Sequence, residues 1–310
     1  MIEIKDVSMR FTDTFQRKEE FTALEHVSIS IPDGCIYGFL GSNGAGKSTL
    51  MRMICGVYKT EQGSIQIDGE EIYDHPKAKE KIFFVNDETI QYTRFNLEQL
   101  KEFYKEFYPQ FSDEIFYRLC ENLSLDIHKK LQKFSKGMKR QAIVIVALAC
   151  QTEYLLLDEA FDGLDPAMRK IVKQMIMQER KERKMTIVIS SHNISEISEL
   201  CDQAMLLHHG RLIFANQVNA ITSNFRKVQI IKKNLQFICQ DIVKLGINVI
   251  QYKNEGSVVQ IVVRGSEEEI LEKLKPLAAD IIETIPLTLE EIFIYELEVR
   301  GYGTDIVEAD

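Results

Sequence analysis

The chain has 310 residues, of which 45% are hydrophobic and 27% are charged, and its formal net charge is −9 at pH 7. This length can hold one large domain and one small domain around a sizeable core. The acidic balance argues against general affinity for nucleic acid, which needs a cationic surface that displaces counterions. Because no run of about 18 apolar residues is present, we expect no transmembrane helix.

The beginning of the chain and its cysteines point to a reducing compartment. The sequence starts with an alternating strand pattern and shows no apolar leader, so we expect no signal segment. The six cysteines have no C-x-x-C spacing, which indicates reduced thiols rather than zinc or a disulfide framework. Short alternating strands are predicted at 2–4, 27–31 and 64–68.

A glycine-rich loop follows the apolar run 35–40 and reads GSNGAGKST. It fits G-x-x-x-x-G-K-[ST], in which glycines let backbone N–H groups curl around a phosphate chain. Lys47 then supplies charge to the β- and γ-phosphates, and the Ser48 hydroxyl binds magnesium. A helix predicted over 48–54 turns its positive end toward the same anion. The predicted nucleotide contacts are Gly41, Ser42, Asn43, Gly44, Ala45, Gly46, Lys47, Ser48 and Thr49.

Residues 134–141 read FSKGMKRQ and lead into an apolar helix predicted over 138–150. Free N–H groups at the start of a helix, together with the Ser135 hydroxyl, can meet a phosphate, and Gly137 allows close backbone approach. Ser135 can also be read simply as the N-cap of a core helix. The two interpretations are compatible.

Two apolar strands predicted further along the chain end in polar residues. The strand predicted over 154–157 is followed by Asp158 and Glu159. Ligands bind where the strands of an open α/β sheet end, so Asp158 is suited to hold magnesium and Glu159 to act as the general base. The strand over 185–189 leads to His192, whose position favours a sensor of the γ-phosphate.

After about residue 223 the sequence carries no further site motif. Its elements follow the order βαββαβ, which predicts a ferredoxin-like α+β domain. This fold does not by itself reveal a role. The predicted elements are strand 227–231, helix 235–245, strands 248–253 and 258–263, helix 267–274, strand 280–286 and a final helix 288–299.

Taken in this order, the segments resemble the ATP-binding cassette (ABC) ATPases over the first two thirds of the chain. The resemblance implies that the glycine-rich loop is Walker A, 154–158 is Walker B, Glu159 is the catalytic glutamate and His192 is the switch histidine. It also assigns Ser135 and Gly137 to the signature loop and Asp165 to the end of the D-loop. The implied cofactors are ATP and Mg²⁺.

The resemblance implies an α/β fold with a P-loop NTPase (RecA-like) core, an antiparallel β subdomain and a helical subdomain at about 88–150. On this basis we expect an ABC ATPase nucleotide-binding domain at 1–222 and the C-terminal accessory domain at 223–310. The family places an aromatic side chain on the adenine, which here falls on Phe11, with Phe15 or Phe21 as alternatives.

Two departures from the family pattern are present. Lys136 and Met138 replace the usual first glycine and glutamine of the signature, a form familiar among cassettes that work with separately encoded export permeases. After the strand predicted over 81–85, the family normally carries a glutamine that touches magnesium. Asp87 stands near that position and can coordinate magnesium through water, or Gln91 serves in a longer loop.

The resemblance predicts an ATP-hydrolysing subunit of an ABC exporter, peripheral at the cytoplasmic face of a bacterial membrane. Its implied partners are an integral membrane permease and a second cassette in a head-to-tail homodimer, with no nucleic acid. Aromatic residues over 92–117 mainly fill the helical subdomain, and some can form a groove for a permease helix. The alternative is a soluble ABC-type ATPase with a regulatory, nucleic-acid or ribosome-related role, although the chain lacks a coiled-coil insertion and a second cassette.

Overall fold

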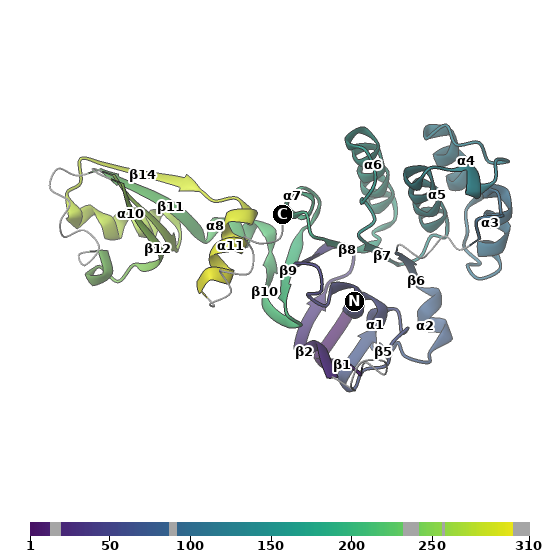
Figure 1. Cartoon of the computed structure of the whole chain (residues 1–310), viewed down its shortest axis with the longest axis horizontal. Helices are drawn as coiled ribbons and strands as arrows, with labels where there is room; N and C mark the ends of the chain where they lie inside the picture. The colour runs from purple at the N-terminus through teal and green to yellow at the C-terminus, as the bar shows by residue number, and fades with distance from the viewer. Residues whose placement is uncertain (13–19, 87–91, 232–241, 256–257, 300–310) are drawn as a thin grey trace. The chain divides into compact units, whose positions relative to one another are not determined.

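The structure is a computed structural model that describes residues 1–12, 20–86, 92–231, 242–255 and 258–299. Its contacts divide the chain into two units, Met1–Ala215 and Asn216–Asp310 (Figure 1). The division lies a few residues before the boundary predicted at 222, because α8 (Val218–Ser223) contacts α11 (Leu289–Val299) of the second unit.

The first unit is built on a six-stranded sheet with the order β10-β9-β3-β8-β7-β6. The strands from β9 to β6 pair in parallel, so their carboxyl ends meet at one edge. Every residue of β3 and β7 is buried, as expected for strands covered on both faces. The strands are β3 (Ile36–Leu40), β6 (Ile82–Val85), β7 (Tyr154–Asp158), β8 (Thr186–Ser191), β9 (Gln203–His208) and β10 (Arg211–Gln217).

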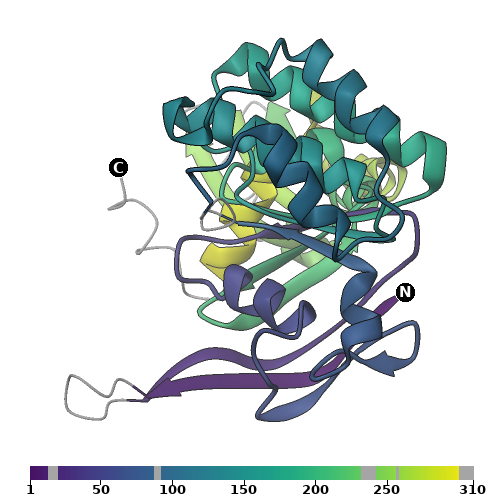
Figure 2. The same cartoon turned by 90° about the vertical axis from the view of Figure 1, so that its right-hand side faces the viewer.

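An antiparallel sheet with the order β2-β1-β4-β5 forms the second layer of this unit. Figure 2 shows β1 and β2 in purple as a long two-stranded ribbon. Their register shifts three times between Ile4 and Arg10, and Asp6 adopts a left-handed backbone there, so the alternation of buried residues breaks. The strands are β1 (Ile2–Thr12), β2 (Glu20–Ile31), β4 (Gln62–Ile67) and β5 (Glu70–Glu71).

Helices cover the parallel sheet and form a separate layer around α5 (Figure 1). Residues 142–149 of α5 are apolar and buried throughout, so this part of the helix is covered on all sides. It starts at Lys136, two residues before the predicted start, because the Ser135 side chain caps it. The helices are α1 (Lys47–Ile54), α2 (Pro76–Glu80), α3 (Leu97–Lys105), α4 (Asp113–Asn122), α5 (Lys136–Ala149), α6 (Pro166–Arg183) and α7 (Ile194–Leu200), with a 3₁₀ turn at Leu131–Lys133.

A polar network ties the two sheets together where β6 and β7 begin. The carboxylate of Asp68, which follows β4, accepts hydrogen bonds from Lys81 Nζ at 2.7 Å and from the Tyr154 hydroxyl at 2.6 Å. Burial opposes the charged form of Asp68, but these bonds and one from the amino group of Met1 outweigh it and lower the pKa of that carboxyl. The network therefore stabilises the ionised carboxylate.

The second unit contains an antiparallel sheet with the order β12-β13-β11-β14. In chain order this is 2-3-1-4, the arrangement of a ferredoxin-like βαββαβ unit. The predicted helix 235–245 lies mostly outside the described residues. The elements are β11 (Phe225–Ile231), β12 (Asn248–Glu255), β13 (Val258–Arg264), α10 (Glu267–Leu274), β14 (Ile281–Pro286) and α11, with a 3₁₀ turn at Lys275–Leu277.

Candidate nucleotide site

The glycine-rich loop connects β3 to α1 and holds Lys47 in a buried position. Gly46 has φ +104°, and an added Cβ would lie 2.5 Å from the Ala23 carbonyl oxygen, so only glycine fits there. Lys47 Nζ donates to the carbonyl oxygens of Gly41 at 2.6 Å and Ser42 at 3.0 Å. Burial lowers the pKa of Lys47, and the Glu159 carboxylate opposes this shift. The ammonium is therefore confined to the interior of the loop.

Asp158 lies at the end of β7 and receives two hydroxyl groups. Ser48 Oγ donates to Asp158 Oδ1 at 3.1 Å, and Ser190 Oγ donates to the same oxygen at 2.5 Å. The Ser48 hydroxyl and the Asp158 carboxylate are hard oxygen donors of the kind that Mg²⁺ prefers. The two residues predicted to bind the metal are thus brought together from segments 110 residues apart.

Glu159 occupies a left-handed backbone conformation with φ 48°. Its N–H donates to Ser190 Oγ at 3.1 Å, which supports a conformation that is costly for a residue other than glycine. Ser190 thus contacts both acidic residues of the site. Ser190 was not among the predicted site residues, although a hydroxyl at the end of an otherwise apolar strand is a signal that could have found it.

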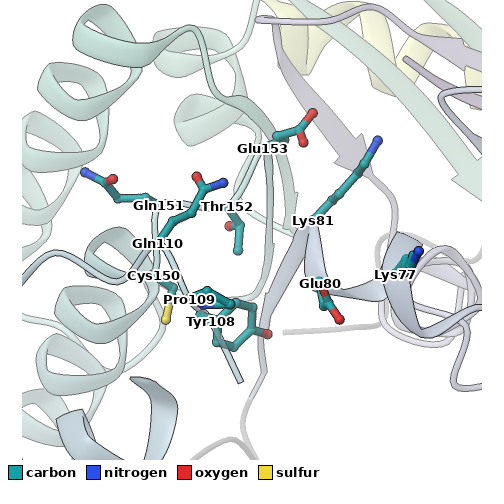
Figure 3. Close-up of a pocket in the computed structure, with 10 residues that line it drawn as sticks. All are labelled: Lys77, Glu80, Lys81, Tyr108, Pro109, Gln110, Cys150, Gln151, Thr152 and Glu153. Atoms are coloured by element: carbon teal, nitrogen blue, oxygen red, sulfur yellow. The ribbon is translucent and has the colours of Figure 1, made fainter. Parts of the chain in front are cut away.

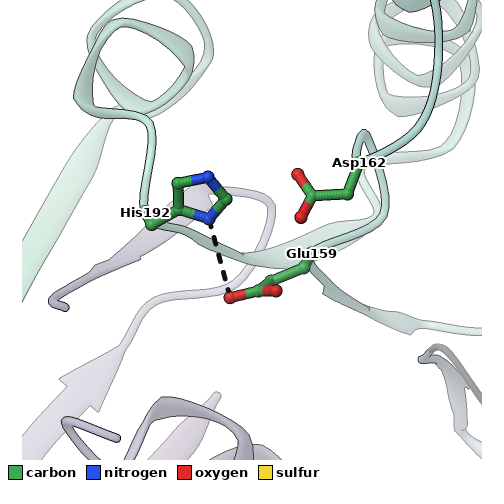
Figure 4. A group of neighbouring side chains, drawn as sticks. All are labelled: Glu159, Asp162 and His192. Atoms are coloured by element: carbon green, nitrogen blue, oxygen red, sulfur yellow. Dashed lines mark ion pairs between the residues drawn. The ribbon is translucent and has the colours of Figure 1, made fainter. Parts of the chain in front are cut away.

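His192 and Asp162 lie beside Glu159 (Figure 4). The distance from His192 Nδ1 to Glu159 Oε1 is 3.8 Å, and one ligand atom from each of the three residues lies within 4.8 Å of the others. His192 follows β8 and Glu159 follows β7, so the neighbouring parallel strands bring the predicted base and the predicted sensor together.

A pocket of about 320 Å³ opens in front of the glycine-rich loop. Phe21 lines it with 60% of its surface exposed, whereas Phe11 contacts Tyr58 with ring centroids 5.5 Å apart. Phe21 is therefore the aromatic side chain at the pocket, adenine stacking by Phe11 stays a prediction, and Phe15 lies outside the described residues. The lining consists of Phe21, Ala23, Asn43, Gly44, Ala45, Gly46, Lys47, Ser48, Thr49 and Glu159.

The predicted signature and D-loop residues lie next to each other. Ser135 Oγ accepts a hydrogen bond from Met138 N–H at 3.1 Å, and the Asp165 side chain caps α6. An added Cβ on Gly137 would lie 3.5 Å from the Gly163 carbonyl oxygen, so the two loops are close. Neither Ser135, Gly137 nor Asp165 is among the described residues that line the pocket of the same molecule.

Arg140 connects the signature helix to the catalytic segment, a link that the sequence analysis did not foresee. Its guanidinium donates to the Asn86 carbonyl oxygen at 3.1 Å and to the Glu159 carbonyl oxygen at 3.4 Å. Asn86 is the last described residue before the segment that contains Asp87 and Gln91. Both candidates for the missing glutamine lie outside the described residues.

A separate pocket of about 230 Å³ lies where β6 and β7 begin (Figure 3). Lys81 and Glu153, which immediately precede these strands, are among its lining residues. The phosphate loop, Glu159 and His192 follow the carboxyl ends of strands in the same sheet. This second pocket is therefore at the opposite edge and is distinct from the candidate nucleotide site.

Comparisons with known proteins agree with this geometry. Residues 24–162 match the family described as ABC transporter. The ABC transporter ATP-binding protein YtrB of Bacillus subtilis is 30% identical over 87% of this chain and 91% of its own length. The bacitracin transport ATP-binding protein BcrA of Bacillus licheniformis is 32% identical over 66% of this chain and 68% of its own length. The chain therefore belongs to the ABC transporter family of ATP-binding proteins, and its first unit is an ATPase cassette of that class.

Solved structures support the same fold. A dimeric post-hydrolysis state of the ATP-binding cassette MJ0796, bound to ADP and Pi, matches with a TM-score of 0.63 at 21% identity, over 70% of this chain and 99% of that chain. The predicted P-loop NTPase fold is thereby confirmed. Within the part of the chain that the structure describes, no helix has the length and apolar character needed to cross a bilayer.

Proposed function

We propose that this chain is the ATP-binding and ATP-hydrolysing subunit of an ABC exporter, driving a separate membrane permease by ATP-dependent closure of a cassette dimer. The observation that carries the proposal is the convergence of Lys47, Asp158, Glu159 and His192 at one sheet edge beside the pocket. These groups come from three segments, at the carboxyl ends of β3, β7 and β8, and each group matches one need of phosphoryl transfer.

The triphosphate of ATP occupies the glycine-rich loop in this proposal. Backbone N–H groups and the start of α1 bind the phosphates, and the Lys47 ammonium exchanges the Gly41 and Ser42 carbonyl oxygens for phosphate oxygens. Phe21 or Phe11 stacks on the adenine. Ser48 and Asp158 would hold Mg²⁺, with Asp87 as a further candidate ligand, and the ion would supply positive charge against the charge that develops on the phosphates.

Glu159 acts on the water that attacks the γ-phosphate. Its side chain is 27% exposed and lines the pocket, so it can reach a water in front of the phosphate chain. The carboxylate orients this water and takes up its proton. His192 donates a hydrogen bond to the γ-phosphate from the adjacent strand end, so the same pair of strands supplies both the base and the sensor.

Closure of a dimer completes the site. Ser135 and the first N–H groups of α5 form a phosphate-binding surface, yet they do not line the pocket of their own molecule. In the proposed head-to-tail dimer, Ser135, Gly137 and Asp165 meet the nucleotide of the second cassette. Hydrolysis removes the bridging γ-phosphate and allows the cassettes to separate.

The helical layer supplies a candidate surface for the permease. Tyr92 stacks on Phe95 with ring centroids 5.2 Å apart and contacts Phe103 at 4.7 Å. Tyr92 and Phe107 remain 41% and 55% exposed, so this aromatic cluster offers apolar area to a helix of the permease. The relatives include a bacitracin transport protein and a methionine import protein, and we infer export from the form of the signature loop.

The test compares wild-type protein with Glu159→Gln. We expect wild type to hydrolyse ATP. The variant should bind ATP without turnover and form a stable dimer in light scattering, because without hydrolysis the γ-phosphate stays in place and the dimer does not open. Glu153→Gln, a change outside the site, serves as the matched control and should behave like wild type.

Absence of both turnover and ATP-dependent dimerisation in the purified chain would contradict the proposed motor. It would favour a nucleotide-sensing regulatory module that binds ATP without hydrolysing it. Coexpression with a candidate membrane permease then tests transport directly, by the ATP-dependent movement of cargo out of cells.

A further inference from the structure

A buried carboxylate lies behind His192 and is not accounted for by the nucleotide site. Glu196 belongs to α7 and is only 3% exposed. Its Oε2 accepts a hydrogen bond from Ser191 Oγ at 2.8 Å. Burial of a carboxylate is costly unless it is paired, so the partners of Glu196 must compensate for that cost.

The Ser191 hydroxyl connects Glu196 to the backbone next to His192. Ser191 Oγ accepts a hydrogen bond from Asn193 N–H at 2.9 Å while it donates to Glu196. The two residues that flank His192 are thus fixed by one hydroxyl. The His192 side chain itself is 50% exposed, so burial does not fix its position, and the flanking backbone determines where the imidazole can lie.

Arg169 supplies the opposite charge from a different helix. Its Nη1 lies 3.0 Å from Glu196 Oε1, and its buried Nε has no hydrogen-bond partner among the described residues. Arg169 N–H donates to the Asp165 carbonyl oxygen at 2.9 Å, so the ion pair begins in the first turn of α6, directly after the D-loop. The chain of contacts therefore joins the start of α6 to both sides of His192.

We propose that Arg169, Glu196 and Ser191 form a positioning relay, a chain of contacts that holds His192 at the γ-phosphate. The relay links the position of His192 to α6, the helix that follows the D-loop. This inference rests on the proposed function, in which His192 contacts the γ-phosphate and the D-loop approaches the second cassette. A movement of α6 on dimer closure displaces Arg169 and, through Glu196, the backbone on both sides of His192. None of the three residues is among those that line the nucleotide pocket.

The same pair of helices contains a matched control. Lys173, one turn after Arg169 on α6, pairs with Glu199 of α7 at 2.8 Å. Glu199 is 65% exposed, so this second pair links the same two helices without reaching Ser191 or His192. A general effect of weakening the contact between α6 and α7 would appear in both pairs. An effect of the relay would appear only at Arg169.

The experiment compares Arg169→Met, Arg169→Lys and Lys173→Met in the full-length protein. Misplacement of a catalytic group by about 1 Å costs up to about 100-fold in rate. We therefore expect Arg169→Met to lower kcat by about 10- to 100-fold while KM for ATP changes less than about threefold. Arg169→Lys should recover most of the rate, and Lys173→Met should match wild type.

A second readout is independent of hydrolysis. The imidazole C2–H resonance of His192 is followed by NMR in protein labelled at histidine, and the His192→Ala spectrum assigns it. Arg169→Met, or Glu196→Gln if the first variant does not fold, should shift this resonance in the absence of nucleotide, whereas Lys173→Met should leave it in place.

Equal behaviour of the Arg169 and Lys173 variants in both readouts would overturn the relay. A shifted His192 resonance in a protein whose wild type shows no ATPase activity would support the positioning contact while rejecting the proposed function. The two failures are therefore distinguishable.

Discussion

The two units of the chain use buried polar groups differently. In the first unit, Lys47, Asp158 and Ser190 are at least 93% buried, and all lie at the carboxyl edge of the parallel sheet. In the described part of the second unit, Glu296 is the buried charged side chain, and it pairs with Arg264 of the neighbouring strand. Burial of polar groups is costly, so a cluster of them at the edge that faces the pocket indicates a working site. Other buried charges of this unit, such as Lys101 and Glu179, form ion pairs in the helices instead. The second unit shows no comparable concentration among its described residues, so its fold alone indicates no chemistry.

The largest effect is expected for a substitution of Lys47, which tests whether the carboxyl edge of the parallel sheet is the site of hydrolysis. Lys47→Ala should reduce ATP hydrolysis by at least about 100-fold, because it removes the charge that stabilises the transferred phosphate. ATPase assays and binding of a fluorescent ATP analogue measure the loss. Lys181→Ala, on the exposed part of α6, is the control. Retained activity in Lys47→Ala would mean that the pocket at the glycine-rich loop is not the site of hydrolysis.

The second prediction tests the apolar core of the second unit. Ile261 is 1% exposed and belongs to a cluster that includes Val228 and Leu274. Ile261→Ala should destabilise this unit by about 2–5 kcal/mol through lost burial and a cavity. Urea unfolding followed by hydrogen exchange should localise the loss to residues after 216. Gln260→Ala, on the opposite face of the same strand, should cost much less.

The ATP affinity of Ile261→Ala tests whether the two units are energetically independent. If Ile261→Ala leaves the affinity for ATP unchanged, the units are energetically separate. A parallel loss of ATP affinity would show instead that the second unit supports the nucleotide site of the first unit.

The smallest expected effect concerns the network around Asp68. Asp68→Asn should cost about 1–3 kcal/mol at pH 7, because Lys81 and Tyr154 lose a charged acceptor. The folded pKa of Asp68 lies below its unfolded value, so its contribution is complete above about pH 4 and is lost as the pH falls toward the folded pKa.

Urea unfolding of wild type and Asp68→Asn between pH 7 and pH 3 measures this contribution. The stability difference should be constant at neutral pH and should narrow below about pH 4. Asp74→Asn is the control, since its left-handed backbone conformation is also tolerated by asparagine. A difference that does not change with pH would show that Asp68 acts through its shape rather than its charge.

The nucleotide site was largely predictable from the sequence because its parts are local. The turn at Gly46 requires a glycine, and Asp158 and Glu159 directly follow an apolar strand, so short segments carried their own physical signals. The site assignments themselves remain predictions that the geometry supports. The confirmed P-loop NTPase fold follows from the same local pattern of strand, loop and helix.

Other features depend on register and distance, which short segments do not encode. Phe11 and Phe21 are opposite each other on β1 and β2, and shifts in the pairing earlier in β1 make their surroundings hard to foresee from alternation. The contacts of Arg140 with Asn86 and Glu159, and of Arg169 with Glu196, join residues from separate elements. Such pairs become visible only when the parallel strands and helices are assembled.

Because of Arg140, α5 contacts both nucleotide sites in the proposed dimer. The N-terminus of α5 faces the nucleotide of the second cassette, while Arg140, one turn further, holds the carbonyl oxygen of Glu159 in its own cassette. Any displacement of α5 that favours ATP at one site therefore alters the catalytic segment of the other. Where that influence changes the affinity for ATP, thermodynamic linkage makes it reciprocal, so in the proposed dimer we expect the two ATP molecules to bind with coupled affinities.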